Sequence, residues 1–168
     1  MHDAAFAFVR DYVTAHGRPS GTVVEIGGRD INGSVRVLFG DPYISTDIRG
    51  GDGVDVVADG ETYQPPAPAG AVVCCEVFEH TPRGEQICAN VFRMLAPGGV
   101  FLVTAAGDGR KPHSAIHGGR VESFEFYENV TRTMLASWLR DFAEVEITEN
   151  PPCGDIYAVA VKGAACAS

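Results

Sequence analysis

The sequence contains no long apolar run and comparatively few basic residues, and each shortage excludes a class of protein. No stretch approaches the roughly 20 apolar residues that span a bilayer, and the first residues lack the basic segment and apolar run of a targeting signal. The formal net charge is -9, from 13 Lys and Arg against 22 Asp and Glu. Nucleic-acid affinity comes mostly from phosphate neutralisation by Lys and Arg. We therefore expect a cytoplasmic protein with neither a membrane nor a nucleic-acid partner.

Cysteine is present in an odd number, and its spacing is irregular. The five cysteines are Cys74, Cys75, Cys88, Cys153 and Cys166. An odd set in a chain of this size does not form a disulfide framework. Neighbours such as Cys74 and Cys75 point to opposite faces of a strand, so they cannot jointly hold one metal ion. We expect buried thiols and no metal.

The length and composition that remain are those of a globular protein. The chain has 168 residues, of which 45% are hydrophobic and 21% charged. One hydrophobic core serves roughly 100 to 200 residues, so residues 1–168 are expected to form a single domain.

Short β-branched and apolar runs alternate with segments of helical periodicity. Strands are predicted over residues 22–26, 43–48, 54–57, 71–75, 100–104, 145–148 and 156–161. Helices are predicted over residues 3–17, from about residue 33 to 39, from Pro82 to Leu95, and over residues 135–142. The pattern predicts an α/β fold, a Rossmann-like sandwich with helices on both faces. Its seven-stranded sheet is mostly parallel and ends in an antiparallel hairpin.

Glycines and carboxylate residues mark the ends of the first two predicted strands. The first strand leads into Glu25, Gly27 and Gly28, and Asp47 closes the second strand about 20 residues later. Glycines let the polar chain of a cofactor lie against the backbone, and a carboxylate after the second strand accepts hydrogen bonds from a ribose diol. This spacing suits any adenosine cofactor.

Four segments in this order resemble those of the class I, Rossmann-like methyltransferases that use S-adenosylmethionine, in particular a small single-domain branch. The segments are residues 24–36, 43–59, 72–80 and 95–104. The resemblance runs from about residue 22 to 103, with a looser match beyond. It implies transfer of a methyl group from S-adenosylmethionine to an oxygen or nitrogen atom of a small acceptor.

The resemblance also implies roles for individual residues. It places Glu25 and Gly27 around the methionine part of the cofactor, Asp47 on the ribose, Ile48 on the adenine face, Asp59 near the adenine amino group and Glu76 between cofactor and acceptor. Gly28 is expected to contact the cofactor as well. The chain departs from the family after Gly27, where Arg29 and Ile31 replace alternating glycines. The pair Asn32 and Gly33 could supply the tight turn instead, because both tolerate positive φ.

A long segment without periodicity follows the fifth predicted strand, over residues 107–120. We expect it to be a mobile lid, because ligands of open α/β sheets lie beyond the carboxyl ends of the strands. Its cations Arg110, Lys111 and Arg120, opposed only by Asp108, predict an acceptor with negative charge.

Three side chains are candidates for a general base at the acceptor: Glu76, His113 and His117. Glu76 could equally serve as a structural carboxylate at a helix start, and His80 is expected to orient the turn before Pro82. The spacing of His113 and His117 would suit metal on a helix, but glycine and proline around them oppose a helix, so no metal site is expected.

Two other functions compete with methyl transfer. An NAD-dependent oxidoreductase would also use the glycine turn and Asp47, but the glycine spacing fits a dinucleotide fingerprint poorly. A protein that binds S-adenosylmethionine as a scaffold, without transfer, would carry the same cofactor residues. A P-loop is excluded because no Gly-Lys-Ser/Thr occurs.

Overall fold

The computed structural model describes residues 2–31 and 33–165. Asn32, which was expected in the tight turn, and Cys166 lie outside the described residues. Within them, no helix has both the length and the apolar character that a membrane span requires.

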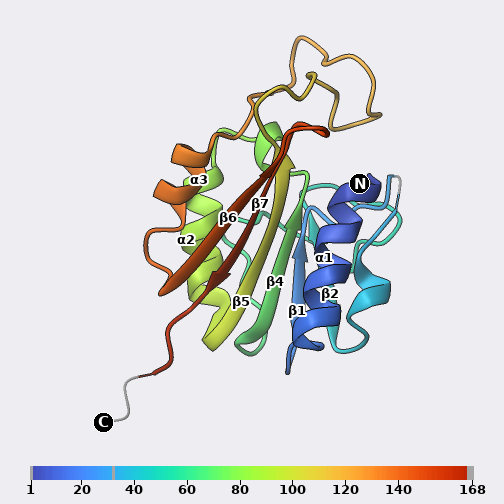
Figure 1. Cartoon of the computed structure of the whole chain (residues 1–168). Helices are drawn as coiled ribbons and strands as arrows, with labels where there is room; N and C mark the ends of the chain where they lie inside the picture. The colour runs from blue at the N-terminus through green and yellow to red at the C-terminus, as the bar shows by residue number, and fades with distance from the viewer. Residues whose placement is uncertain (1, 32, 166–168) are drawn as a thin grey trace.

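One sheet of seven strands forms the centre of the molecule (Figure 1). Its strands are β1 (Val23–Ile26), β2 (Tyr43–Asp47), β3 (Val56–Val57), β4 (Ala69–Cys75), β5 (Leu95–Ala106), β6 (Glu144–Asn150) and β7 (Asp155–Val161). They lie in the order β3-β2-β1-β4-β5-β7-β6. The pairings from β3 through β5 are parallel, whereas β7 is antiparallel to both β5 and β6. The predicted fold class is therefore confirmed.

Helices cover both faces of the sheet (Figure 1). Helix α1 (Asp3–His16) packs Val9 onto one face, where it meets buried side chains of β1, β2, β4 and β5. Helices α2 (Gly84–Met94) and α3 (Arg132–Trp138) pack Ile87, Val91 and Leu135 onto the other face. The central strands are apolar on both faces because both are covered.

Three predicted helices have different bounds in the structure, among them the last, which spans residues 132–138 instead of 135–142. The segment after Gly33 forms only a 3₁₀ turn, η1 (Arg36–Leu38), because Gly40 takes a positive φ of 70° and β2 begins at Tyr43. Helix α2 begins two residues after Pro82, following another 3₁₀ turn, η2 (Phe78–His80). It ends at Met94, and Leu95 already belongs to β5.

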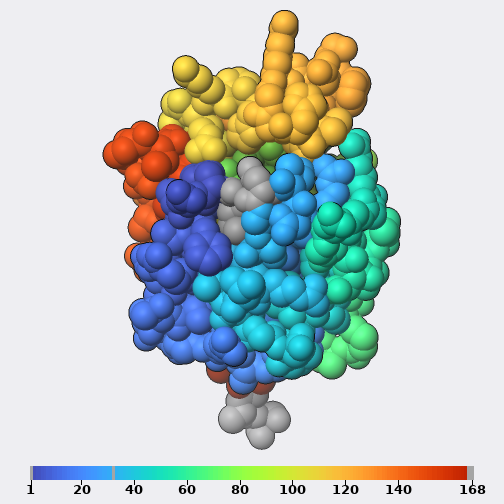
Figure 2. Space-filling model, turned by 90° about the vertical axis from the view of Figure 1, so that its right-hand side faces the viewer, coloured from blue at the N-terminus to red at the C-terminus, as the bar shows by residue number. Residues whose placement is uncertain are grey.

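The segment between β5 and α3 contains neither helix nor strand, so it is longer than predicted. It rises above the carboxyl ends of the parallel strands in Figure 1 and forms an overhang, yellow to orange, in Figure 2. We call residues 107–131 the overhanging loop. The fold thereby places a long polar segment opposite the strand ends.

Candidate functional site

A cavity of about 1060 Å³ lies between the carboxyl ends of β1, β2 and β4 and the overhanging loop. The predicted site residues that line it are Glu25, Gly27, Gly28, Asp47, Ile48, Asp59, Glu76 and His113. His117 does not line it. The strand ends and the loop thus share one space large enough for a cofactor and a small second molecule.

The turn after β1 is built on two glycines. Gly27 has a φ of 74°, and the amides of Gly27 and Gly28 both donate hydrogen bonds to the Thr46 carbonyl, at 2.8 and 3.0 Å. A Cβ atom on Gly28 would collide with Oγ of Ser45 and lie 2.7 Å from Oε2 of Glu25, so a side chain fits there only if those two side chains move. Farther along, Gly33 has the expected positive φ, at 110°.

Glu25 is a buried carboxylate beside this turn. The residue is 5% exposed, and burial raises its pKa, although the neighbouring hydroxyl groups of Tyr43 and Ser45 oppose the shift. A buried carboxyl group at the cavity wall is available to a polar or cationic ligand group.

The carboxylates after β2 and β3 are held by their own turns. Asp47 accepts a hydrogen bond from the Arg49 amide and Asp59 from the Glu61 amide, each at 2.9 Å. Between them along the cavity wall, the apolar side chain of Ile48 is 67% exposed. Two carboxylates and an exposed apolar surface suit a ligand with hydroxyl groups, an amino group and a flat apolar face.

Glu76 follows β4 in a strained backbone conformation, with a φ of 57°. Its amide donates to the Thr104 carbonyl at 2.8 Å, and its Oε1 accepts from the Thr104 hydroxyl at 3.0 Å. Non-glycine residues at positive φ cost free energy and cluster at functional sites. The strain and the bonds to β5 fix this carboxylate at the centre of the cavity floor.

A buried ion-pair network joins the chain start, the overhanging loop and β7. Arg110 donates to Asp155 at 2.6 Å and to the Cys153 carbonyl at 3.0 Å, and Nε2 of His2 lies 3.3 Å from Asp155 and 3.4 Å from Glu76. Pairing with Asp155, and then with Glu76, raises the pKa of His2 to about 9. The expectation that only Asp108 opposes the loop cations is therefore wrong for Arg110.

The other two loop cations remain exposed. Lys111 and Arg120 both line the cavity, and neither has an ion-pair partner within the described residues. The basic character predicted for the loop thus resides in these two side chains.

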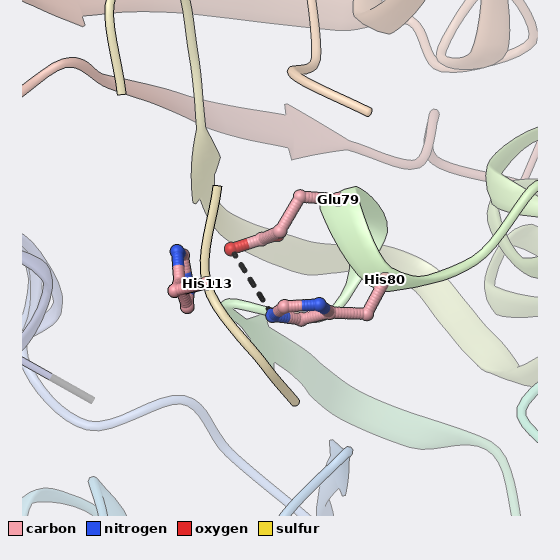
Figure 3. A group of neighbouring side chains, drawn as sticks. All are labelled: Glu79, His80 and His113. Carbon is pink, nitrogen blue, oxygen red and sulfur yellow. Dashed lines mark ion pairs between the residues drawn. The ribbon is translucent and has the colours of Figure 1, made fainter. Parts of the chain in front are cut away.

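A second polar cluster consists of Glu79, His80 and His113, which approach one another from η2 and the overhanging loop (Figure 3). Glu79 is 0% exposed, and burial raises the pKa of its carboxyl group to about 8. Burial lowers the pKa of His80 to about 4. The Tyr127 ring packs edge-on against both imidazoles, with centroids 5.4 and 5.2 Å away.

His117 points to a different environment from that of His113. Its Nδ1 accepts a hydrogen bond from the Gly119 amide at 3.1 Å, and its Nε2 lies 3.6 Å from Glu122. The four-residue spacing does not bring the two imidazoles together, because this part of the loop is not helical. The structure therefore separates His117 from the other two candidate bases.

Sequence reasoning missed His2, Asp155 and Glu79 as members of the site. Asp155 lies 45 residues beyond Arg110, so no local spacing relates them. Glu79 belongs to the segment 72–80 that carried the family resemblance, and its only local signal was the adjacent His80. His2 and Asp155 come together only in the folded chain, and so do Glu79 and His113.

Comparison with known proteins finds a family model that matches part of the sequence and several solved structures with a similar fold. A family model described as a methyltransferase domain matches residues 47–103. No curated protein matches the sequence.

Three solved structures with bound S-adenosylhomocysteine have a similar fold. A 1,6-didemethyltoxoflavin-N1-methyltransferase from Burkholderia thailandensis is 20% identical, with a TM-score of 0.68 over 95% of this chain and 79% of that one. DhpI is 22% identical, with a TM-score of 0.68 over 95% and 84%. A phosphoethanolamine N-methyltransferase from Haemonchus contortus is 14% identical, with a TM-score of 0.68 over 95% and 53%. At these identities the likeness establishes the fold.

Proposed function

We propose that this chain, a class I S-adenosylmethionine-dependent methyltransferase by its methyltransferase domain and its fold, methylates an oxygen or nitrogen atom of a small, negatively charged acceptor. The observation that carries the proposal is the single cavity of about 1060 Å³. It joins the glycine turn and Asp47 to the strained Glu76 and the overhanging loop.

The residues of the cavity fit the cofactor. Glu25, Gly27 and Gly28 would hold its methionine part, and the positive φ of Gly27 allows the chain to turn beside it. Asp47 would accept hydrogen bonds from the ribose, and Asp59 one from the adenine amino group. The exposed Ile48 would pack on the adenine face, where burial of its side chain is favourable.

The cofactor would supply a methyl group on a sulfonium sulfur, and a hydroxyl or amino acceptor that takes this methyl group would give up one proton to a nearby base or to water. The chain positions the acceptor for this step and covers it from water. We assign the contacts with the acceptor to Glu76 and His113, because both line the cavity and Glu76 is fixed by Thr104. We leave His117 out of this role, because its side chain does not line the cavity.

The preference for negative charge rests on Lys111 and Arg120. Both are exposed cations on the cavity wall of an otherwise acidic protein. Such groups steer and hold a carboxylate or phosphate. The similar structure from Haemonchus contortus contains phosphomonomethylethanolamine, a small molecule with a phosphate group, which supports this class.

We also propose that residues 1–168 act as one domain in the cytoplasm. Both core clusters lie against the same sheet, and the Cys74 and Cys88 thiols are free and buried, which suits a reducing compartment.

An acceptor screen tests the proposal. The protein is incubated with S-adenosylmethionine and paired small hydroxyl or amino compounds that differ only by a carboxylate or phosphate, and S-adenosylhomocysteine release is measured. We expect turnover with the charged member of a pair, and loss of that preference in a Lys111→Gln/Arg120→Gln variant. Tight cofactor binding with no turnover on any class would instead indicate a cofactor-binding scaffold.

A further inference from the structure

The cluster of Glu79, His80 and His113 contains a carboxylate whose burial is not explained by its protein contacts. Glu79 is 0% exposed, and neither Oε1 nor Oε2 has a hydrogen-bond partner of good geometry among the described residues, although the backbone amides of Glu79 and Ala106 oppose the rise of its pKa and His80 Nε2 lies 4.0 Å from Oε1 (Figure 3). His80 Nδ1 is likewise buried without a partner there. A buried carboxylate without partners costs several kcal/mol unless a cation or donor meets it.

We propose that Glu79, His80 and His113 bind a divalent first-row transition metal ion at the acceptor end of the cavity. Their three ligand atoms lie within 4.8 Å of one another. Bonds of about 2.0 to 2.2 Å to one ion place ligand atoms roughly 3 to 3.5 Å apart, so rotation of the side chains by about 1 Å closes the site. One carboxylate and two imidazoles suit Zn²⁺, Mn²⁺, Fe²⁺ or Co²⁺ better than Mg²⁺ or Ca²⁺, which prefer oxygen ligands alone.

The surroundings of His113 prepare its ring for this role. Its Nδ1 lies 3.2 Å from the Lys111 carbonyl, which can only accept a hydrogen bond, so Nδ1 carries the proton and Nε2 keeps its lone pair. Metal-bound histidines commonly donate their other ring N–H to a carbonyl in this way. The Tyr127 ring and the His80 ring, with centroids 5.2 and 5.0 Å away, hold the imidazole from the side.

The burial of the three ligands differs in a way that indicates a catalytic ion. His80 and His113 line the cavity, whereas Glu79 lies behind them. An ion held by three protein ligands keeps further coordination positions, and here these would face the acceptor space. The catalytic role rests on the proposed methyl transfer: the ion would bind an acceptor oxygen and lower the pKa of its hydroxyl group. The acceptor class is then a hydroxyl compound.

The site is distinct from the two pairs whose metal binding the sequence argued against. Those pairs were Cys74 with Cys75 and His113 with His117, whereas the proposed ligands combine His113 with side chains from η2 (Figure 3).

The alternative explanation for the buried Glu79 is that its side chain is a neutral carboxylic acid, because burial raises its pKa. The nearby Glu76 favours that neutral form and Arg110 opposes it. A neutral carboxylic acid would not retain a metal ion, so a measurement of metal binding distinguishes the metal site from the neutral acid.

Co²⁺ titration of chelator-treated protein tests the site, because its visible spectrum distinguishes imidazole and carboxylate ligands from thiolates. We expect one Co²⁺ per chain, with no thiolate band. Glu79→Gln keeps the side-chain volume, and His113→Ala changes only the overhanging loop. Each should weaken Co²⁺ binding at least about tenfold. His117→Ala, a histidine of the same loop outside the cluster, should bind as the unmodified chain does.

Binding of S-adenosylhomocysteine, measured on the same variants, separates this site from the proposed function. Unchanged affinity in His113→Ala would show that the cofactor half is intact while metal is lost. Equal Co²⁺ affinity in the unmodified chain, Glu79→Gln and His113→Ala would overturn the metal site, even if methyl transfer is found. Metal binding without methyl transfer would sustain the site and contradict only its catalytic role.

Discussion

The two halves of the cavity are built in different ways. The proposed cofactor half is made where β1 and β2 end, with Gly27, Gly28 and Asp47 fixed by backbone bonds to adjacent strands. The acceptor half is assembled from η2, the overhanging loop, the chain start and β7, mostly through charged side chains such as Arg110 and Asp155. Parallel strand ends position a ligand by geometry alone, whereas the loop is positioned by polar pairs.

This contrast explains why the halves should respond differently to mutation and pH. Changes at the glycine turn should crowd the side chains packed around it, those of Val77, Ser45 and Glu25, and displace them from the cavity wall. Changes in the loop should alter charge and affinity while the sheet stays folded. The predictions below test this difference, beginning with the largest effect.

Replacing Gly28 should damage the cofactor half most. In Gly28→Val the new Cβ would lie 2.7 Å from Oε2 and 2.9 Å from Cδ of the buried Glu25. Overpacking of this kind costs typically 1 to 3 kcal/mol, and the added side chain would also displace Glu25, which lines the cavity. We expect a lower melting temperature and no measurable binding of S-adenosylhomocysteine by calorimetry. Gly50→Ala is the matched control, because its Cβ would meet nothing closer than 3.5 Å.

Removing the Asp47 carboxylate should weaken cofactor binding without unfolding the protein. A hydrogen bond to a charged group contributes about 1.5 to 3 kcal/mol, which corresponds to a roughly ten- to hundredfold loss of affinity. Asp47→Ala should show this loss by calorimetry, and Asp52→Ala, which does not line the cavity, should not. Unchanged affinity in a folded Asp47→Ala protein would remove the residue from the ribose site.

The acceptor half should make stability depend on pH through His2. Its pKa is raised from 6.5 to about 9 by Asp155 and Glu76, so the stabilisation is complete below about pH 6.5 and is lost as the pH rises to about 9. Because His2 is partly exposed, we expect a loss of about 1 to 3 kcal/mol across this window. Urea unfolding at several pH values should show the loss, and His2→Gln should abolish it. An identical pH profile for His2→Gln would contradict the pairing, with His16→Gln as the control.

The smallest effect is expected for the exposed loop cations. Exposed ion pairs contribute about 0.2 to 1 kcal/mol, so Lys111→Gln/Arg120→Gln should raise the KM of a charged acceptor roughly two- to tenfold. The effect should fade at high salt, because screening weakens exposed charges. Arg140→Gln, whose side chain pairs with Glu85 instead, should leave KM unchanged. If neither the double substitution nor salt changes the KM, Lys111 and Arg120 do not contribute to recognition of the acceptor.

The same contrast decides what could be predicted from the sequence. The strands, their mixed sheet and the carboxylates after β1 and β2 follow from local patterns, because strand periodicity and turn glycines are written within a few residues. The short helix expected after Gly33 failed because Gly40 and the start of β2 leave room for one turn only. Helical periodicity in the sequence does not show how few residues are left before the next strand.

The acceptor half could be predicted only in part. Its loop was expected, but Arg110 was assigned to a negatively charged acceptor, because no local pattern indicates its partner Asp155, 45 residues away. The sequence spacing suggested His117 as the neighbour of His113, whereas the fold brings His113 close to His80 and Glu79. Charge pairs between distant segments depend on how the loop crosses the sheet, and no sequence period records that path.

The most direct test of the central claim is a comparison of S-adenosylhomocysteine with NAD in thermal unfolding. A ligand that binds only the native state at 100 times its Kd adds about 2.7 kcal/mol to the free energy of unfolding. We predict that S-adenosylhomocysteine raises the melting temperature of the unmodified chain and has no effect on Gly28→Val, while NAD at the same concentration stabilises neither. Stabilisation by NAD without stabilisation by S-adenosylhomocysteine would contradict the methyltransferase account.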